Sequence, residues 1–94
     1  LDIVRRELAD AEGAVLRLTR AEFDLIAALA QSGSAPLGRD YLVEVIASAE
    51  ATTNVRTVDV LISRIRRKLA AAGPSAPRIV TVHAQGYQLV RTEG

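Results

Sequence analysis

The 94-residue chain contains no cysteine, methionine or tryptophan, and its only histidine is His83. Without cysteine, neither a disulfide framework nor a thiolate metal site can form. His83 has no partner residue with which it could share a metal ion, so we expect no metal site and no cofactor. The lack of cysteine is also compatible with a reducing compartment, and we expect a cytoplasmic protein.

Long apolar segments are absent as well. The longest uninterrupted apolar run, Leu25 to Ala30, has six residues, whereas a membrane-spanning helix needs about 18. Nothing at the N-terminus has the pattern of a signal peptide. We therefore expect no membrane partner.

The residue sets of common catalytic sites are missing too. The sequence has no cysteine nucleophile, no phosphate-binding P-loop and no predicted face that carries a pair of carboxylates. A histidine–acid–hydroxyl set would depend on a single histidine in a loop. We therefore expect that the chain is not an enzyme.

The length suits one small domain, residues 1–94, with a single core. The chain begins with Leu1 rather than Met, so we expect it to be the C-terminal fragment of a longer protein.

The net charge of +1 conceals an uneven distribution of charge along the chain. Residues 1–50 hold nine acids and five arginines (net −4), whereas residues 51–94 hold seven bases and two acids (net +5). The basic half is a candidate face for a polyanion.

The first 18 residues alternate loosely between apolar and polar and are interrupted by a turn-rich cluster at Asp10–Gly13. This pattern predicts short strands near 1–4, 6–9 and 14–18, which together would form a small antiparallel sheet.

A helix start follows directly. Thr19 and Glu22 have the spacing of a capping box, and Leu18 and Phe23 occupy the positions of a hydrophobic staple. The predicted helix ends at Ser32–Gly33. In this setting Glu22 is a helix cap rather than a general base, and Phe23 belongs to the core.

Two more helices and a hairpin complete the predicted elements. A short helix over 39–47, with Leu42, Val45 and Ile46 facing inward, leads through a loop at 48–53 to a third helix. Thr53 or Asn54 caps that helix, which runs to about Ala72. The β-rich runs 78–82 and 87–90 are joined by 83–86, where Gly86 can adopt a positive φ. Three helices over 19–72 and a hairpin over 78–90 predict an α+β fold, the winged helix-turn-helix.

The third helix has two different faces. With about 100° per residue, one apolar stripe covers an arc of roughly 100°; it consists of Val58, Leu61, Ile62, Ile65 and Leu69. The opposite side carries Arg56, Val60, Ser63, Arg64 and Arg67, with Thr57 at its edge. Guanidiniums, hydroxyls and a small apolar side chain suit the base edges and phosphates of a DNA major groove.

Several further residues in or near this helix are predicted to have a structural role or to lie at the edge of the candidate DNA-binding face. Arg66 and Lys68 lie on the flanks of the wheel, where contact with the DNA backbone is an open alternative to exposure to solvent. Asp59 near the helix N-terminus is interpreted as structural, favoured by the helix dipole, and as a partner for Arg66 two turns further on. Tyr87 is predicted to lie in the core beneath the hairpin, and His83 to contact a phosphate from the hairpin tip.

Five segments resemble the OmpR/PhoB effector domain, and the resemblance covers nearly the whole chain, from about Asp2 to Val90. The segment over 56–69 is highly specific, and each of the others alone would be weak. The matching residues are Leu18-Thr19-x-x-Glu22-Phe23-x-Leu25-Ile26, Arg39-Asp40-x-Leu42, Arg56-Thr57-Val58-Asp59-Val60-x-Ile62-Ser63-Arg64-Ile65-Arg66-Arg67-Lys68-Leu69, Ile79-x-Thr81-Val82 and Gly86-Tyr87.

The resemblance implies the DNA-binding output domain of a bacterial two-component response regulator, acting in transcription regulation and a phosphorelay. In that family the domain follows a phosphorylatable receiver domain and opens with a four-stranded sheet. Members commonly bind double-stranded DNA as head-to-tail pairs on direct repeats. The loop between the second and third helices, here 48–53, can contact RNA polymerase.

The resemblance also implies roles for individual residues. Arg56 matches a phosphate contact at the start of the recognition helix, and Arg67 matches another backbone contact. Thr81 matches a phosphate contact at the base of the wing. Positions facing bases or the groove wall are matched by Val60, Ser63 and Arg64. The complete predicted DNA-binding set is Arg56, Thr57, Val60, Ser63, Arg64, Arg67, Lys68, Thr81 and His83.

The sequence departs from the family pattern at three places. His83-Ala84 replaces the usual Arg-Gly before the wing tip, so we do not expect the wing to read the minor groove. Ile46-Ala47 replaces a frequent Trp-Gly, which removes an aromatic backbone contact. Ser63 stands where some members carry another arginine, so the base preference cannot be transferred from a relative.

One alternative function stays open at this point. A basic amphipathic helix can also bind an acidic protein or an anionic surface without reading DNA. The hairpin and the capping-box helix favour a folded core into which the third helix packs, and such packing disfavours a helix lying on a membrane. Comparing binding to vesicles and to duplexes at equal salt would separate the two functions.

Overall fold

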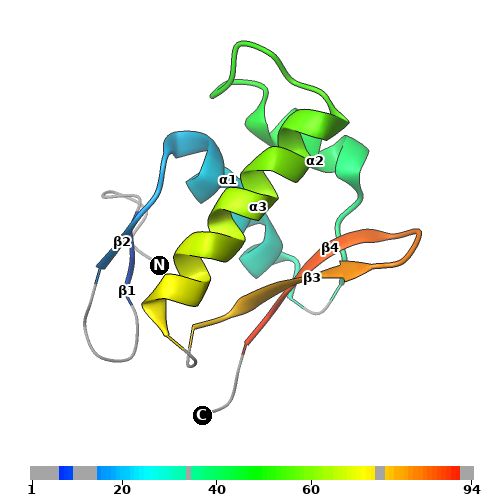
Figure 1. Ribbon diagram of the computed structural model, residues 1–94. Coiled ribbons are helices and arrows are strands. Elements are labelled where there is room, and N and C mark those ends of the chain that lie inside the picture. The colour runs from blue at the N-terminus through cyan, green and yellow to red at the C-terminus, as the bar shows by residue number, and fades with distance from the viewer. Residues whose placement is uncertain (1–6, 10–14, 34, 74–75, 92–94) are drawn as a thin grey trace.

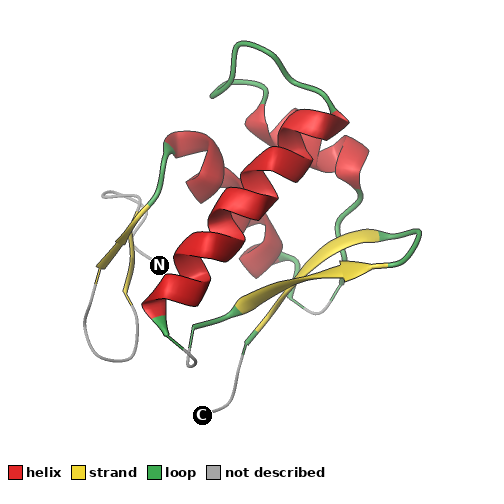
Figure 2. Ribbon diagram, in the orientation of Figure 1, coloured by secondary structure: helices red, strands yellow, loops and turns green. Residues whose placement is uncertain are grey.

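The computed structural model describes residues 7–9, 15–33, 35–73 and 76–91, and it has the predicted winged-helix architecture. Helix α3 crosses the front of α1 and α2, with one small sheet beside each of its flanks (Figures 1 and 2). In chain order the elements are β1 (Glu7–Ala9), β2 (Val15–Arg17), α1 (Arg20–Gln31), α2 (Arg39–Ile46), α3 (Val55–Ala72), β3 (Arg78–Val82) and β4 (Gly86–Val90).

The N-terminal sheet consists of β1 and β2 within the described residues. The two strands are antiparallel, with Glu7 opposite Arg17. They correspond to the strands predicted near 6–9 and 14–18, whereas the strand predicted near 1–4 lies outside the described residues.

Helix α1 begins and ends as its sequence predicts. The amide of Glu22 donates to Thr19 Oγ1 at 3.2 Å, and the amide of Thr19 donates to Glu22 Oε1 at 2.9 Å, so both halves of the capping box are formed. Ser32 is the C-cap, and Gly33 follows with a φ of +65°. Phe23 is buried.

Helices α2 and α3 also match their predicted ranges. Leu42 and Ile46 of α2 are fully buried, and Val45 packs partly buried against the same core. Of the two candidate caps of α3, Asn54 is the one used: its Oδ1 accepts from the amide of Thr57 at 2.9 Å.

The core confirms the helical wheel of α3. All five residues of its apolar stripe are at most 3% exposed. They meet Leu25, Ile26 and Leu29 of α1, Leu42 and Ile46 of α2, and Ile79 and Tyr87 of the hairpin. Burying a large aliphatic side chain contributes roughly 1.5–3 kcal/mol, so this stripe fixes the rotation of α3 about its own axis.

The C-terminal hairpin, the wing, pairs β3 with β4 in an antiparallel register that places Thr81 opposite Tyr87 and Val82 opposite Gly86. Gly86 has a φ of +126°, as the sequence predicts, and Ala84 has a φ of +63°, which it does not. The wing is also bonded to the α1–α2 linker. The amide of Leu37 donates to the Tyr87 carbonyl at 2.8 Å, and the Tyr87 amide donates to the Leu37 carbonyl at 3.0 Å.

Asn54→Ala is expected to lower the free energy of unfolding by about 1 kcal/mol, because the Thr57 amide loses its acceptor. Asn54→Asp is the matched control: it keeps the acceptor and places a negative charge at the helix N-terminus, where the dipole favours it. Urea denaturation followed by circular dichroism measures both. A wild-type midpoint for Asn54→Ala would contradict the capping role.

Candidate nucleic-acid interface

The outward face of α3 is the candidate interface. Arg56, Val60, Ser63, Arg64 and Arg67 are all exposed, and Val60 is 44% exposed although it is apolar. Because the opposite stripe is buried, the helix cannot roll to hide these side chains. Figure 1 shows α3 at the front of the fold. Its 18 residues extend over about 27 Å, and an α-helix fits into the major groove of B-DNA.

The arginines of this face are available for an external anion. The ion pairs within the described part of the chain are Arg20–Asp24, Arg39–Asp59 and Lys68–Glu22. None of these pairs includes Arg56, Arg64 or Arg67. A guanidinium can bind a phosphate or the edge of a guanine through two parallel hydrogen bonds.

Thr57 sits at the edge of the face and is held by its own cap. Its Oγ1 lies 3.3 Å from the Thr52 carbonyl and 3.2 Å from Asn54 Oδ1. The residue is half-buried. Its hydroxyl therefore ties the end of the preceding loop to the first turn of α3.

The wing places its two predicted site residues on the surface. His83 is exposed in the turn, and Thr81 is exposed on β3. Thr81 Oγ1 accepts a hydrogen bond of 2.9 Å from Arg66 Nη2. The hydroxyl proton of Thr81 can still be donated, because a hydroxyl is both a donor and an acceptor.

The partner of Arg66 is the wing, not Asp59. Its Nε donates to the Ile79 carbonyl at 3.0 Å, and its guanidinium lies 5.5 Å from the centroid of the Tyr87 ring. The predicted pairing of Asp59 with Arg66 is therefore wrong. Residues seven apart on a helix are separated by about 10.5 Å along its axis, which is too far for a direct ion pair.

Asp59 instead binds residues from two other elements. Arg39 Nε donates to its Oδ1 at 3.1 Å, Arg39 Nη2 binds its Oδ2, and the Tyr87 hydroxyl donates to Oδ1 at 2.7 Å. Burial by itself would raise the pKa of Asp59, but the hydrogen bonds from Arg39 and Tyr87 outweigh it and hold that pKa below its ordinary value. Burial, followed by the bond to Asp59, raises the pKa of Tyr87, which keeps the phenol a donor.

Lys68 binds on the inner side of α3. Its Nζ is bonded to Glu22 Oε1, and the Glu22 side chain is only 1% exposed. Burial would raise the pKa of Glu22, but Lys68 and the Thr19 cap lower it overall. The ammonium of Lys68 neutralises a buried carboxylate, so we leave this residue out of the proposed contact set.

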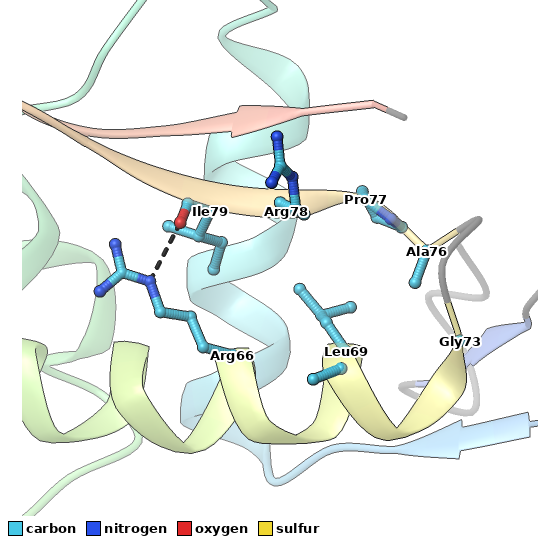
Figure 3. Close-up of a pocket in the computed structure, with 8 residues that line it drawn as sticks. Arg66, Leu69, Gly73, Ala76, Pro77, Arg78 and Ile79 are labelled. Atoms are coloured by element: carbon cyan, nitrogen blue, oxygen red, sulfur yellow. Dashed lines mark hydrogen bonds between the residues drawn. The ribbon is translucent and has the colours of Figure 1, made fainter. Parts of the chain in front are cut away.

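Within the described part of the chain, a hollow lies on each flank of α3. One, of about 330 Å³, lies between the start of α3 and the wing, and Arg39, Asp59, Thr81 and His83 are among its lining residues. The other, of about 510 Å³, lies between the end of α3 and β3. Figure 3 shows Leu69 and Ile79 facing each other there, beside the Arg66 bond. None of the predicted site residues lines this second hollow, which is mainly apolar.

The sequence that forms this exposed basic helix and the β-hairpin beside it also matches a known protein family. The family described as "Transcriptional regulatory protein, C terminal" matches residues 13–89. The chain belongs to this family. Membership confirms the resemblance to OmpR/PhoB effector domains, and the family is one of transcription regulators rather than of enzymes.

Several members of this family are similar over nearly the whole chain. The transcriptional regulatory protein AruR of Pseudomonas aeruginosa is 38% identical over 87 residues, which are 93% of this chain and 36% of AruR. The chain therefore spans about a third of the length of that relative. None of the helices in the described residues is long and apolar enough to cross a membrane.

Solved structures of related domains have the same fold. The DNA-binding domain of RstA from Klebsiella pneumoniae, in complex with the RstA box, has a TM-score of 0.73 and 32% identity. The match covers 95% of this chain and 87% of that one. The DNA-binding domain of CssR from Bacillus subtilis has a TM-score of 0.76 and 26% identity, with coverages of 95% and 96%.

Three contacts that position the wing and α3 were not predicted from the sequence: the bond from Arg39 to Asp59, the backbone pairing of Leu37 with Tyr87, and the hydrogen bond that the Tyr87 hydroxyl donates. Each acts across a long sequence separation, as in the 28 residues between Asp59 and Tyr87. The one available signal was chemical, because a buried phenol usually needs a polar partner.

Proposed function

We propose that this domain binds a specific double-stranded DNA sequence with α3 in the major groove and so regulates transcription. The observation that carries the proposal is the outward face of α3: three unpaired arginines within the described residues, on a helix whose opposite stripe is buried. The family membership and the RstA domain solved with its DNA box support this function over the alternative of a module without DNA readout.

In this proposal, residues at different positions on the outward face contact different parts of the DNA. Arg64 contacts a base edge, as an arginine does with guanine N7 and O6. Arg56 and Arg67 contact phosphates; they lie eleven residues, or about 16 Å, apart along the helix axis. Val60 and Ser63 lie between these arginines and face bases or the groove wall. Thr57 remains a proposed contact at the edge of the face.

The wing adds backbone contacts in this proposal. Thr81 uses its free hydroxyl proton, since its oxygen already accepts from Arg66. His83 contacts a phosphate from the exposed turn. A neutral imidazole offers less positive charge than the arginine frequent at this place, so the wing contributes less than α3.

The proposed domain context, arrangement on DNA and polymerase contact rest on the resemblance to the OmpR/PhoB family. We propose that the domain is the output domain of a cytoplasmic two-component response regulator and that a receiver domain precedes residues 1–94. Copies bind direct repeats as head-to-tail pairs. The loop over 48–53 contacts RNA polymerase; several of its residues are exposed beside the start of α3.

Selection from randomised duplexes at near-physiological salt tests the proposal, followed by affinity measurements with variants. Arg64→Ala is expected to cost about 1–3 kcal/mol on the selected site and to relax one base position. Arg56→Ala is expected to weaken binding to all duplexes similarly and to reduce the salt slope by about 1, because it removes one phosphate contact.

Arg91→Ala is the charge-matched control, because Arg91 is an exposed arginine outside α3. It should leave the base preference unchanged. Two results would overturn the proposal: affinity for every duplex unaffected by both α3 variants, or binding to anionic vesicles that exceeds duplex binding at equal salt. A selected site without repeated half-sites would remove the head-to-tail arrangement alone.

A further inference from the structure

The Asp59 carboxylate is a junction between three elements. Both of its oxygens bind the Arg39 guanidinium at the start of α2, and Oδ1 also accepts from the Tyr87 hydroxyl of β4. We refer to Arg39, Asp59 and Tyr87 as the clamp. None of the three lies on the outward face of α3, so the clamp is distinct from the residues proposed to contact DNA.

A second attachment lies two turns along the same flank of α3. Arg66 is seven residues after Asp59, and seven residues rotate a helix by almost two full turns, so both side chains point to the wing. Arg66 holds β3 through the Ile79 carbonyl and Thr81 Oγ1. These two attachments are about 10.5 Å apart along the helix, and they add to the backbone bonds between the wing and Leu37 in defining the angle of the wing to α3.

The clamp is closed by the main chain. Tyr87 exchanges two backbone hydrogen bonds with Leu37, and Arg39 follows Leu37 by only two residues. A continuous ring of contacts therefore runs from Leu37 to Tyr87, to Asp59, to Arg39 and back along the chain. Movement of the wing would have to break a backbone bond or a bond to Asp59.

The clamp also compensates the negative charge of Asp59, because Arg39 is bonded to this carboxylate. This carboxylate lines the same hollow as Thr81 and His83, which are proposed to contact phosphates. An uncompensated carboxylate there would repel a phosphate, but Arg39 neutralises it, and its contact with Asp59 raises the pKa of Arg39 further. The Asp59 carboxylate can therefore lie near the proposed phosphate contacts of Thr81 and His83 with little repulsion of the phosphate.

We propose that Asp59 is a positioning residue, which fixes the angle between the wing and the recognition helix before DNA is bound. This inference rests on the proposed DNA binding. A preset angle lets the wing and α3 contact one duplex without the loss of conformational freedom that ordering a loose wing would require.

The test uses Tyr87→Phe, which removes the bond to Asp59 and keeps the buried ring, together with Asp59→Asn and Arg39→Gln. Each is expected to reduce affinity for the selected duplex measurably, by up to roughly tenfold, since pre-ordering a few groups has effects of this size. In hydroxyl-radical footprints the nucleotides protected by the wing should lose protection, while those protected by α3 stay protected.

Thr19→Ala is the control for general destabilisation, because it breaks the cap of α1 and touches no clamp residue. It should lower the melting temperature with no change in footprint. Residual dipolar couplings of the free domain give a readout without DNA: the angle of the wing to α3 should become variable in Tyr87→Phe and not in Thr19→Ala.

Three outcomes would overturn the inference. Wild-type affinity and footprint for Tyr87→Phe would do so, as would an unchanged wing angle in the free domain. A loss confined to Arg39→Gln, with a reduced salt slope, would show instead that Arg39 binds a phosphate directly. If the wild-type domain selects no duplex at all, the proposed function fails, and the dipolar couplings still test the clamp.

Discussion

Gly86→Ala is expected to destabilise the domain by about 3–5 kcal/mol and to detach the wing from the α1–α2 linker. A Cβ on Gly86 would lie 1.9 Å from the Leu37 carbonyl oxygen and 2.9 Å from Gly38 Cα. Both obstacles are backbone, and that carbonyl accepts the Tyr87 amide, so it cannot retreat without losing a bond. The φ of +126° adds strain of about 1–3 kcal/mol to the cost of overpacking.

Gly73→Ala separates these two causes. Gly73 has a similar φ of +114°, but a Cβ there would meet no heavy atom of the described residues within 4 Å. It should therefore show the backbone strain alone, about 1–3 kcal/mol. Urea denaturation of both variants measures the difference, and amide exchange at Leu37 and Tyr87 reports the detachment. Equal losses for the two glycines would contradict the close approach of the wing to the linker.

Lys68→Met is expected to lower the free energy of unfolding by about 2–3 kcal/mol at pH 7, because it leaves the buried Glu22 carboxylate without its cation. Breaking a fully buried ion pair costs about 3–5 kcal/mol. The smaller value applies because the Lys68 side chain is 34% exposed and because the Thr19 cap still holds Glu22.

Arg67→Met is the matched control, since it removes the same charge from the exposed neighbouring position. Its effect on stability should stay within about 0.5 kcal/mol, whereas its DNA affinity should fall. Lys68→Met should show the reverse pattern. If Lys68→Met weakened DNA binding as much as Arg67→Met and left stability unchanged, Lys68 would belong to the interface as the sequence predicted.

The pH dependence of Lys68→Met gives an independent check. In the wild type the lowered pKa of Glu22 contributes stability that is present above the unfolded pKa of about 4.3 and is lost as pH falls through the lower folded pKa. Without Lys68, the hydrogen bond and the charge that lower the pKa of Glu22 are lost while its burial remains, so the folded pKa should be higher than in the wild type. The stability deficit of Lys68→Met relative to the wild type should therefore shrink as the pH falls.

The local features of the fold were predictable from the sequence. The capping box of Thr19 and Glu22 is formed as its spacing indicates, and the five residues of the predicted apolar stripe of α3 are the five residues of this helix that are buried. Caps depend on residues three apart, and a helical stripe depends only on the helical repeat. Neither requires knowledge of where other elements lie.

The partners of the flanking charges were not predictable in the same way. The wheel placed Arg66 and Lys68 on the two flanks of α3, but it could not show that one flank meets the wing and the other meets α1. Lys68 and Glu22 are 46 residues apart, and Arg39 and Asp59 are 20 apart. At such separations many acids and bases are chemically equivalent candidates.

The sequence alone therefore determined which face of α3 is turned outward, because hydrophobic burial needs only the periodicity of apolar residues and acts on the helix as a whole. The tertiary structure decided which charges remain free on that helix. A hydrogen bond or ion pair depends on distances of about 3 Å between specific atoms, and those distances exist only after the wing, α1 and the linker have packed around α3. Among the described residues, that packing leaves Arg56, Arg64 and Arg67 without an ion-pair partner, while Asp59, Arg66 and Lys68 connect α3 to the rest of the domain.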